Sequence, residues 1–253
     1  MSALFRSREP EPAVVEPVPT VFPKIQGAEL AALFVGNRIA GDFYDSIRVS
    51  PERVLFGMLD VAGRRTENRG LLIKAQQIFR ETGSELFTTS DLNESEAVTT
   101  LTIQLNRGLI EASGKVHSCP AFIGCYHEKF GTLCYTNAGH TPGLLGNATG
   151  ILRLPSTGLP LGLFSHATHE APTIALEKNS ALVLISRGVI ECGGHNGQSE
   201  EFGLERVEQL LGGGAHGEGA EQTCKSILNA ADVFCSSAPP RDDRTALALV
   251  RTN

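Results

Sequence analysis

The sequence predicts an α+β protein, with antiparallel sheets formed by strands that lie before and after a pair of helices. Its composition is that of a globular domain, with 41% hydrophobic and 20% charged residues among 253. Strand-like segments follow one another as in hairpins, and long helical periodicity is confined to two consecutive segments. Because strands and helices do not alternate regularly, antiparallel sheets are favoured over a doubly wound parallel sheet.

Apolar runs at 31–35 and 54–59 are typical of buried strands, and two helices are expected next, over 68–87 and 94–113. Apolar residues recur every three or four positions in both helices, which gathers them on one face. These residues are Leu72, Ala75, Ile78 and Phe79 in the first helix and Val98, Leu101, Leu105 and Leu109 in the second. Gly114 is expected to end the second helix, because glycine readily adopts a left-handed conformation there.

The second half of the chain is predicted to form further strands and then two short helices. A hairpin turn is expected at 128–131. The glycine-rich stretch 212–219 lacks the pattern of a phosphate-binding loop and is interpreted as a flexible connector. The predicted strands are 121–127, 132–137, 143–145, 151–154, 181–185 and 245–251, and the short helices are 204–211 and 222–231.

Composition divides the chain into a tail and one domain. Residues 8–23 hold five of the 13 prolines, which predicts an extended tail over 1–24 and a single domain over 25–253. The formal net charge of −6 argues against general nucleic-acid binding. No apolar run approaches the ~20 residues of a membrane-spanning helix, and no signal-peptide core is present. We therefore expect a cytoplasmic protein without nucleic-acid or membrane partners.

The cysteines and histidines give no metal-binding pattern. The six cysteines form no Cys-x-x-Cys pair and are expected to be reduced structural thiols. His166 and His169 have one spacing that could suit a metal, but no cysteine or carboxylate framework surrounds them. Both are expected to be surface residues.

Acidic residues at predicted strand ends are the candidates for chemistry. Asp42 and Asp45 share one short motif, Asp60 ends an apolar strand, and Asp242 and Asp243 precede the last strand. Carboxylates gathered at one edge of a sheet make an oxygen-rich site suited to Mg²⁺ or Mn²⁺. The alternative is that these residues only form turns at strand ends.

Six short motifs, in a fixed order along most of the chain, resemble the SpoIIE-type branch of the PPM family, the bacterial metal-dependent protein serine/threonine phosphatases. The motifs are Gly-Asp-Phe-Tyr-Asp at 41–45, Asp-Val-Ala-Gly at 60–63, Tyr-Thr-Asn-Ala-Gly-His-Thr-Pro at 135–142, Gly-Leu-Pro-Leu-Gly at 158–162, Phe-Gly-Leu-Glu-Arg at 202–206 and Asp-Asp-Arg-Thr at 242–245. The resemblance implies two antiparallel sheets packed face to face with helices outside. It also implies two Mg²⁺ or Mn²⁺ ions that activate a water, and phosphorylated substrates such as anti-sigma-factor antagonists of the STAS fold.

The resemblance also implies roles for individual residues. Asp60 matches the carboxylate that bridges both metals, and Val61 supplies a backbone carbonyl ligand. Asp42 matches a ligand of the second metal and Asp242 a ligand of the first. A further set is expected to support these ligands or to face phosphate: Asp45, Asp243, Arg64, Arg65 and Arg187. The motif residues Asn137, Gly139 and His140 are expected to form tight strand connections.

Two departures from the family pattern put hydrolysis in question. Arg187 stands where the family has an aspartate that binds the first metal, and Arg64 and Arg65 replace a His-Gly pair. A unit charge about 4 Å away at an effective dielectric near 20 contributes about 4 kcal/mol, so an arginine among the ligands opposes a divalent cation. Arg187 is expected to form an ion pair with Asp60 and Asp242, or alternatively to turn to solvent. The chain is then either a phosphatase with a degraded metal site or an inactive pseudophosphatase that binds a phosphoprotein or a regulatory partner.

Overall fold

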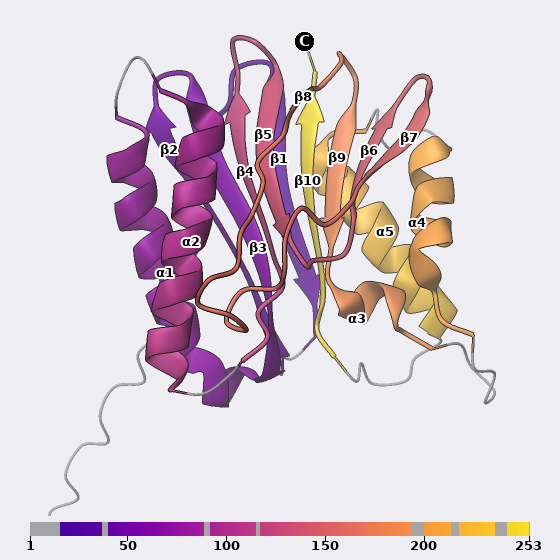
Figure 1. Ribbon diagram of the computed structural model, residues 1–253. Helices are drawn as coiled ribbons and strands as arrows, with labels where there is room; N and C mark the ends of the chain where they lie inside the picture. The colour runs from indigo at the N-terminus through magenta and orange to yellow at the C-terminus, as the bar shows by residue number, and fades with distance from the viewer. Residues whose placement is uncertain are drawn as a thin grey trace, which may run out of the picture.

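Ten strands of the described chain form two antiparallel sheets that pack face to face, as the sequence predicted (Figure 1). The computed structural model describes residues 16–36, 40–88, 92–114, 117–193, 200–213, 218–235 and 242–252. One sheet has the order β1 (Ala28–Val35), β10 (Arg244–Arg251), β9 (Ala181–Ile185), β6 (Gly143–Asn147) and β7 (Gly150–Leu154). The other has the order β2 (Ala40–Ser50), β3 (Arg53–Arg64), β4 (Ala121–His127), β5 (Thr132–Ala138) and β8 (Thr173–Ala175).

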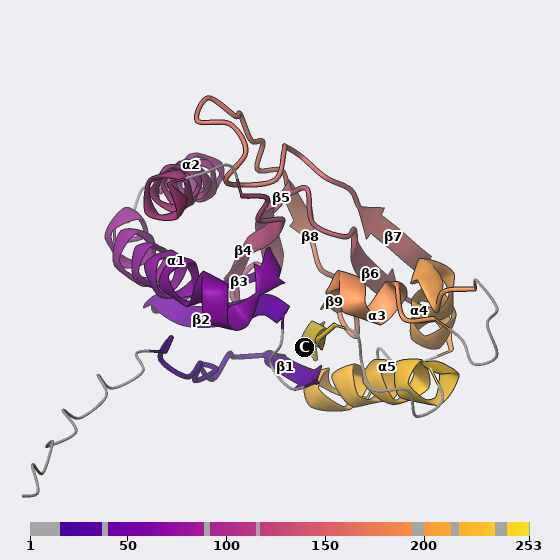
Figure 2. The same cartoon turned by 90° about the horizontal axis from the view of Figure 1, so that it is seen from below.

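Helices cover the outer face of each sheet. The β2–β8 sheet is covered by α1 (Arg65–Leu86) and α2 (Glu94–Ser113), and the β1–β7 sheet by α4 (Gly203–Gly212) and α5 (Ala220–Cys235). The four-residue helix α3 (Arg187–Ile190) lies at one end of the sandwich, the end that faces the viewer in Figure 2. None of the described helices is long and apolar enough to cross a membrane.

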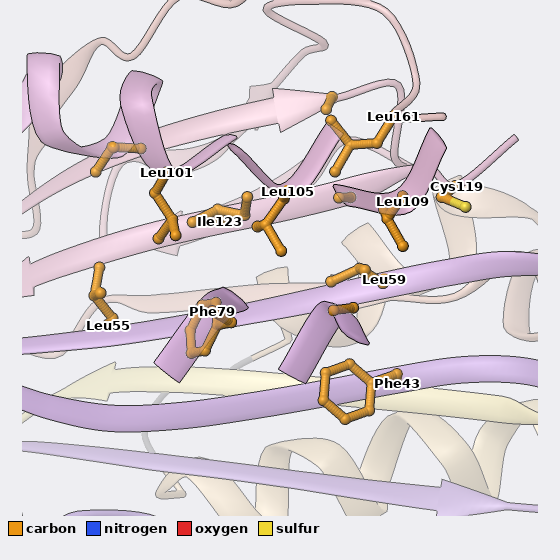
Figure 3. Close-up of a cluster of buried hydrophobic side chains, with 14 of the residues drawn as sticks. Phe43, Leu55, Leu59, Phe79, Leu101, Leu105, Leu109, Cys119, Ile123 and Leu161 are labelled. Carbon is orange, nitrogen blue, oxygen red and sulfur yellow. The ribbon is translucent and has the colours of Figure 1, made fainter. Parts of the chain in front are cut away.

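The strand period of two residues sorts the apolar side chains of β3 into two layers. Leu55 and Leu59 face α1 and α2, where they join a cluster that includes Phe79 (Figure 3). Phe56 and Met58 face the other sheet and form the layer between the sheets. All five of these side chains are at most 2% exposed, so deleting one large side chain here would cost about 3–5 kcal/mol.

Most predicted elements are confirmed, and three are new. The helix over 94–113 and the strands over 121–127 and 181–185 have the predicted bounds. Gly114 ends α2 with φ of 62°, as expected. The strands β2 and β8 and the helix α3 were not predicted, and β3 continues beyond Asp60 to Arg64.

The described part of the predicted tail is fastened to the domain. Residues 16–24 carry no helix or strand, but the Val18 amide donates to Oε1 of Gln76 (2.7 Å) and Nε2 of Gln76 donates to the Val18 carbonyl (2.8 Å). Glu16 forms an ion pair with Arg69 at 2.6 Å. Residues 1–15 lie outside the described chain, and the domain boundary at residue 24 stays a prediction.

Two expectations about cysteine and histidine are wrong. Cys192 and Cys235 form a disulfide with 6.1 Å between their Cα atoms, because the fold brings the end of α5 beside the segment after α3. Their sequence separation of 43 residues gave no signal of this. The other four cysteines are free and buried, as expected. His169 is buried rather than on the surface, whereas His166 is exposed.

Candidate functional site

The polar site forms where the apolar layer between the two sheets ends. Asp60 continues the inward face of β3 after Phe56 and Met58, and Asp42 lies directly opposite Asp60 in the β2–β3 pair. On the other sheet, Ser186 follows the inward face of β9 and Thr245 precedes that of β10. On four strands, the row of inward-facing side chains thus ends in a polar residue at the same end of the sandwich.

One of two hydrogen bonds made by Thr245 joins the two sheets at this end, and the other lies within its own sheet. The Thr245 hydroxyl donates to Oδ2 of Asp42 at 2.7 Å, and the Thr245 amide donates to Oγ of Ser186 at 3.0 Å. Ser186 and Thr245 had no predicted role as individual residues. Each lies two residues from an inward-facing leucine of its strand, in β9 and β10 respectively. This alternation could have predicted that both side chains point toward the site.

Arg187 occupies the predicted place beside Asp60. Its Nε donates to Oδ2 of Asp60 at 2.8 Å and its Nη2 donates to Oδ1 at 3.2 Å, a planar fork on one carboxylate. The pKa of Arg187 is raised mainly by this hydrogen bond, and Asp60 and Asp242 also raise it electrostatically. The ion pair with Asp60 is confirmed, whereas Asp242 contributes through its charge.

The neighbouring carboxyl groups repel one another. Burial, and then the charge of Asp60, raises the pKa of Asp42 to about 7, against the hydrogen bonds from Thr245 and Ser186. Burial also raises the pKa of Asp242, with Asp60 and Asp243 adding to it and Arg187 opposing it. The side chain of Asp242 accepts a hydrogen bond from the Asp243 amide at 2.9 Å. Asp42, Asp60 and Asp242 therefore share one electrostatic environment, as predicted for a site.

Two glycines allow the backbone to close around this environment. A Cβ at Gly41 would collide with the carbonyl oxygen of Val61, and a Cβ at Gly188 would collide with the carbonyl oxygen of Asp243. Gly188 therefore keeps α3 against the start of β10 and sets the position of Arg187. The Val61 carbonyl, the predicted backbone ligand, lies against Gly41.

The Asn-Ala-Gly-His turn has the predicted structural role. The Asn137 side chain donates to the carbonyls of Leu154 (3.2 Å) and Thr141 (3.3 Å) and accepts from the His140 amide (2.8 Å). Gly139 has φ of 70° and packs on Pro160, where a side chain would collide. Burial lowers the pKa of His140, against the charge of Asp60, so the imidazole stays neutral at pH 7.

Asp45 is not part of the site, contrary to expectation. It is three residues from Asp42 on the same strand, so its side chain leaves the opposite face of β2 toward α1. Arg80 binds it through Nε (2.7 Å) and Nη2 (3.0 Å), and Gln76 and Thr20 also donate to it. Because β2 was not predicted as a strand, this alternation was not available from the sequence.

The remaining predicted residues are Arg64, Arg65 and Asp243. Arg64 is exposed at the end of β3, and Arg65 begins α1 with a side chain outside the described set. A cavity of about 280 Å³ reaches Asp42, Asp243 and Thr245 from the side of β1 and β2, and residues 17–20 form its outer wall.

The donor set does not fit a two-ion centre in this arrangement. Both carboxylate oxygens of Asp60 already accept from Arg187. Among the described residues, no group of three or more histidine, cysteine, aspartate or glutamate side chains converges closely enough to hold a metal. The guanidinium supplies at Asp60 the positive charge that a cation would otherwise supply.

Two helix-covered antiparallel sheets with carboxylates at one end define the fold of the PPM (PP2C-type) metal-dependent protein phosphatases. The sequence model of the family described as Stage II sporulation protein E (SpoIIE) matches residues 50–252. The chain belongs to this family and contains a PPM-type serine/threonine phosphatase domain of the RsbU/SpoIIE kind.

Solved structures share this fold at low sequence identity. The RsbU and RsbW domains of Rv1364c from Mycobacterium tuberculosis superpose with a TM-score of 0.70 and 21% identity, over 91% of this chain and 62% of that one. The SiaA-PP2C domain of Pseudomonas aeruginosa gives 0.72 and 14%, over 88% and 86%. A fragment of SpoIIE from Bacillus subtilis that contains its PP2C phosphatase domain gives 0.69 and 12%, over 90% and 64%. A comparison with curated protein sequences finds no match.

Proposed function

We propose that this domain binds a phosphorylated protein and has lost the two-metal hydrolysis of its family. The observation that supports this most directly is the fork of Arg187 on both oxygens of Asp60. Asp60 is the residue that matches the bridging carboxylate, so a cation that bound it would have to displace Arg187. The Arg187 side chain is 44% exposed, which leaves part of the guanidinium open to an incoming anion.

The proposed partner is a phosphoserine- or phosphothreonine-containing protein of the STAS-type anti-sigma-factor antagonist class. By the motif match, Arg187 and the exposed Arg64 would face the phosphate of the partner, and guanidinium groups recognise phosphate by bidentate hydrogen bonds. The similarity to the RsbU and RsbW domains of Rv1364c supports a regulatory protein as the partner, and the STAS class is part of the proposal.

A second candidate is a weak phosphatase that uses Mg²⁺ or Mn²⁺. It is favoured by the retention of Asp42, Asp60 and Asp242, because the charge of Asp60 helps to raise the pKa of Asp42 and that of Asp242. If the domain is such a phosphatase, binding of the substrate or the metal moves Arg187 away from Asp60.

Titration of the metal-free protein with Mn²⁺ distinguishes the two. We expect calorimetry to show no tight two-site binding, and we expect hydrolysis of p-nitrophenyl phosphate in Mn²⁺ to stay at background. A fluorescent phosphoserine peptide from a STAS-type antagonist should bind more tightly than its unphosphorylated form. Robust turnover that Asp60→Asn abolishes would instead establish the weak phosphatase.

A further inference from the structure

A disulfide joins the segment that follows α3 to the end of α5. Cys192 follows α3 closely, and Cys235 is the last residue of α5. After Cys235, the next residue that the structure describes is Asp242. The bond therefore ties the far end of the Arg187 segment to the end of α5.

Contacts at both ends hold the helix α3 in addition to the packing of Gly188 against Asp243. At its start, the Ser186 amide donates to the Thr245 carbonyl at 3.0 Å, which fixes it to the sheet. Beyond its end, the Cys192 carbonyl accepts from the Phe202 amide at 2.9 Å, and the Cys192 side chain is bonded to Cys235. Within the helix region, the amides of Val189 and Glu191 donate to the carbonyls of Ser186 and Arg187. So short a helix has little stability of its own.

We propose that Cys192 and Cys235 form a reversible thiol–disulfide switch that responds to low-molecular-weight thiols and disulfides and sets how firmly α3 holds Arg187 on Asp60. This goes beyond the proposed function, because it concerns the ion pair itself and holds whether or not the site hydrolyses phosphate.

The chemistry follows from the different exposure of the two sulfurs. Cys235 is 7% exposed, whereas Cys192 is partly exposed, so an external thiolate attacks Sγ of Cys192. The Cys192–Cys235 bond breaks, and Cys235 leaves as a thiolate that takes up a proton. A second thiol attacks the mixed disulfide, which releases the small disulfide and leaves Cys192 reduced. A small-molecule disulfide drives the reverse sequence.

The other four cysteines provide an internal contrast. Burial raises the pKa of Cys119 and of Cys224 to about 12 and that of Cys134 to about 11, and it raises the pKa of Cys125 well above its usual value. Such thiols are weak nucleophiles and lie away from solvent. A thiol reagent applied to the folded protein should therefore discriminate the switch pair from these four.

The test measures the redox state of Cys192 and Cys235 and the amide hydrogen exchange of α3 in the same protein. After treatment with glutathione disulfide, peptide mapping should show Cys192 linked to Cys235, and dithiothreitol should return both to alkylation. Amide hydrogen exchange at Val189 and Glu191 should become at least about threefold faster on reduction, while α2 stays unchanged. The double variant Cys192→Ser/Cys235→Ser should show the faster exchange in both buffers.

Two results would overturn the proposal. One is that Cys192 and Cys235 remain free to alkylation after treatment with glutathione disulfide. The other is that the bond forms but exchange at Val189 and Glu191 is the same in both redox states, which would separate the disulfide from the holding of Arg187.

Discussion

Two arginine–carboxylate forks lie on opposite sides of the same sheet, and they differ in what surrounds the carboxylate. Asp45 is 1% exposed and accepts hydrogen bonds from Arg80, Gln76, Thr20 and the Ser46 amide. Asp60 faces the end of the interior, where burial and the charge of Asp60 raise the pKa of Asp42 and that of Asp242.

The Arg80–Asp45 fork is structural, whereas the Arg187–Asp60 fork lies in the candidate site. At Asp45 both carboxylate oxygens accept hydrogen bonds, as a buried carboxylate requires. At the other fork, the Arg187 guanidinium binds Asp60, while burial and the charge of Asp60 raise the pKa of the neighbouring Asp42 to about 7. An arginine–carboxylate pair thus stabilises the fold at Asp45, and at Asp60 it stands where the family resemblance implies a metal ligand.

The largest expected difference between the forks is in stability. Arg80→Ala should lower the free energy of unfolding by about 3 kcal/mol, because it leaves Asp45 buried without its charge partner. Arg187→Ala should cost about 1 kcal/mol or less in metal-free buffer, since this pair is more exposed. Urea unfolding of both variants measures this, with Gln77→Ala as a control for removing a long side chain from α1. Equal losses would show that the two forks are energetically alike.

A smaller expected effect concerns metal binding. Arg187→Asp restores the family carboxylate and should make the protein less stable without metal, because the carboxyl groups then repel one another. Mn²⁺ at a hundredfold excess over its dissociation constant should return about 2.7 kcal/mol. The parent should not respond, and neither should Arg64→Asp, which makes the same charge change at an exposed position without contact to Asp60.

Thermal melts with and without Mn²⁺ decide this prediction. A parent protein already stabilised by Mn²⁺, or an Arg187→Asp variant indifferent to it, would mean that Arg187 does not stand in the place of a metal. Activity does not have to return with the metal, because Arg64 and Arg65 also depart from the family pattern.

The sequence predicted the parts of this molecule that rest on local periodicity. The helix α2 was predicted to the residue because its apolar spacing and its terminal glycine agree. The strand β2 was missed because Gly41, Asp42 and Asp45 interrupt its apolar pattern, and the orientation of Asp45 was lost with it. The helix α3, with only four residues, is too short to have a period.

The site was predicted from motif order, whereas its geometry depends on contacts between distant segments. The fork of Arg187 on Asp60 joins residues 127 positions apart, and it was expected because the family places both at one centre. The bond from Thr245 to Asp42 spans 203 positions, and the disulfide spans 43. No local pattern encodes such pairings, since they follow from the order of strands in the two sheets.

The last expected effect is a pH dependence of stability, which distinguishes the carboxyl groups around Asp60 from the Asp45 fork. The pKa of Asp42 is raised from 3.8 to about 7 in the folded protein. Between these values the folded chain keeps a proton that the unfolded chain has lost, so the stability due to Asp42 is fully present below about pH 4 and is lost as the pH rises to about 7. Asp42→Asn removes this dependence, so its stability relative to the parent should rise steadily from about pH 4 to pH 7 and should exceed that of the parent above pH 7. Urea unfolding from pH 4 to pH 8 gives the difference between the two proteins, with Glu111→Gln on the exposed face of α2 as the control. A constant difference across this range would show that Asp42 is ionised throughout and that Arg187 balances the whole cluster.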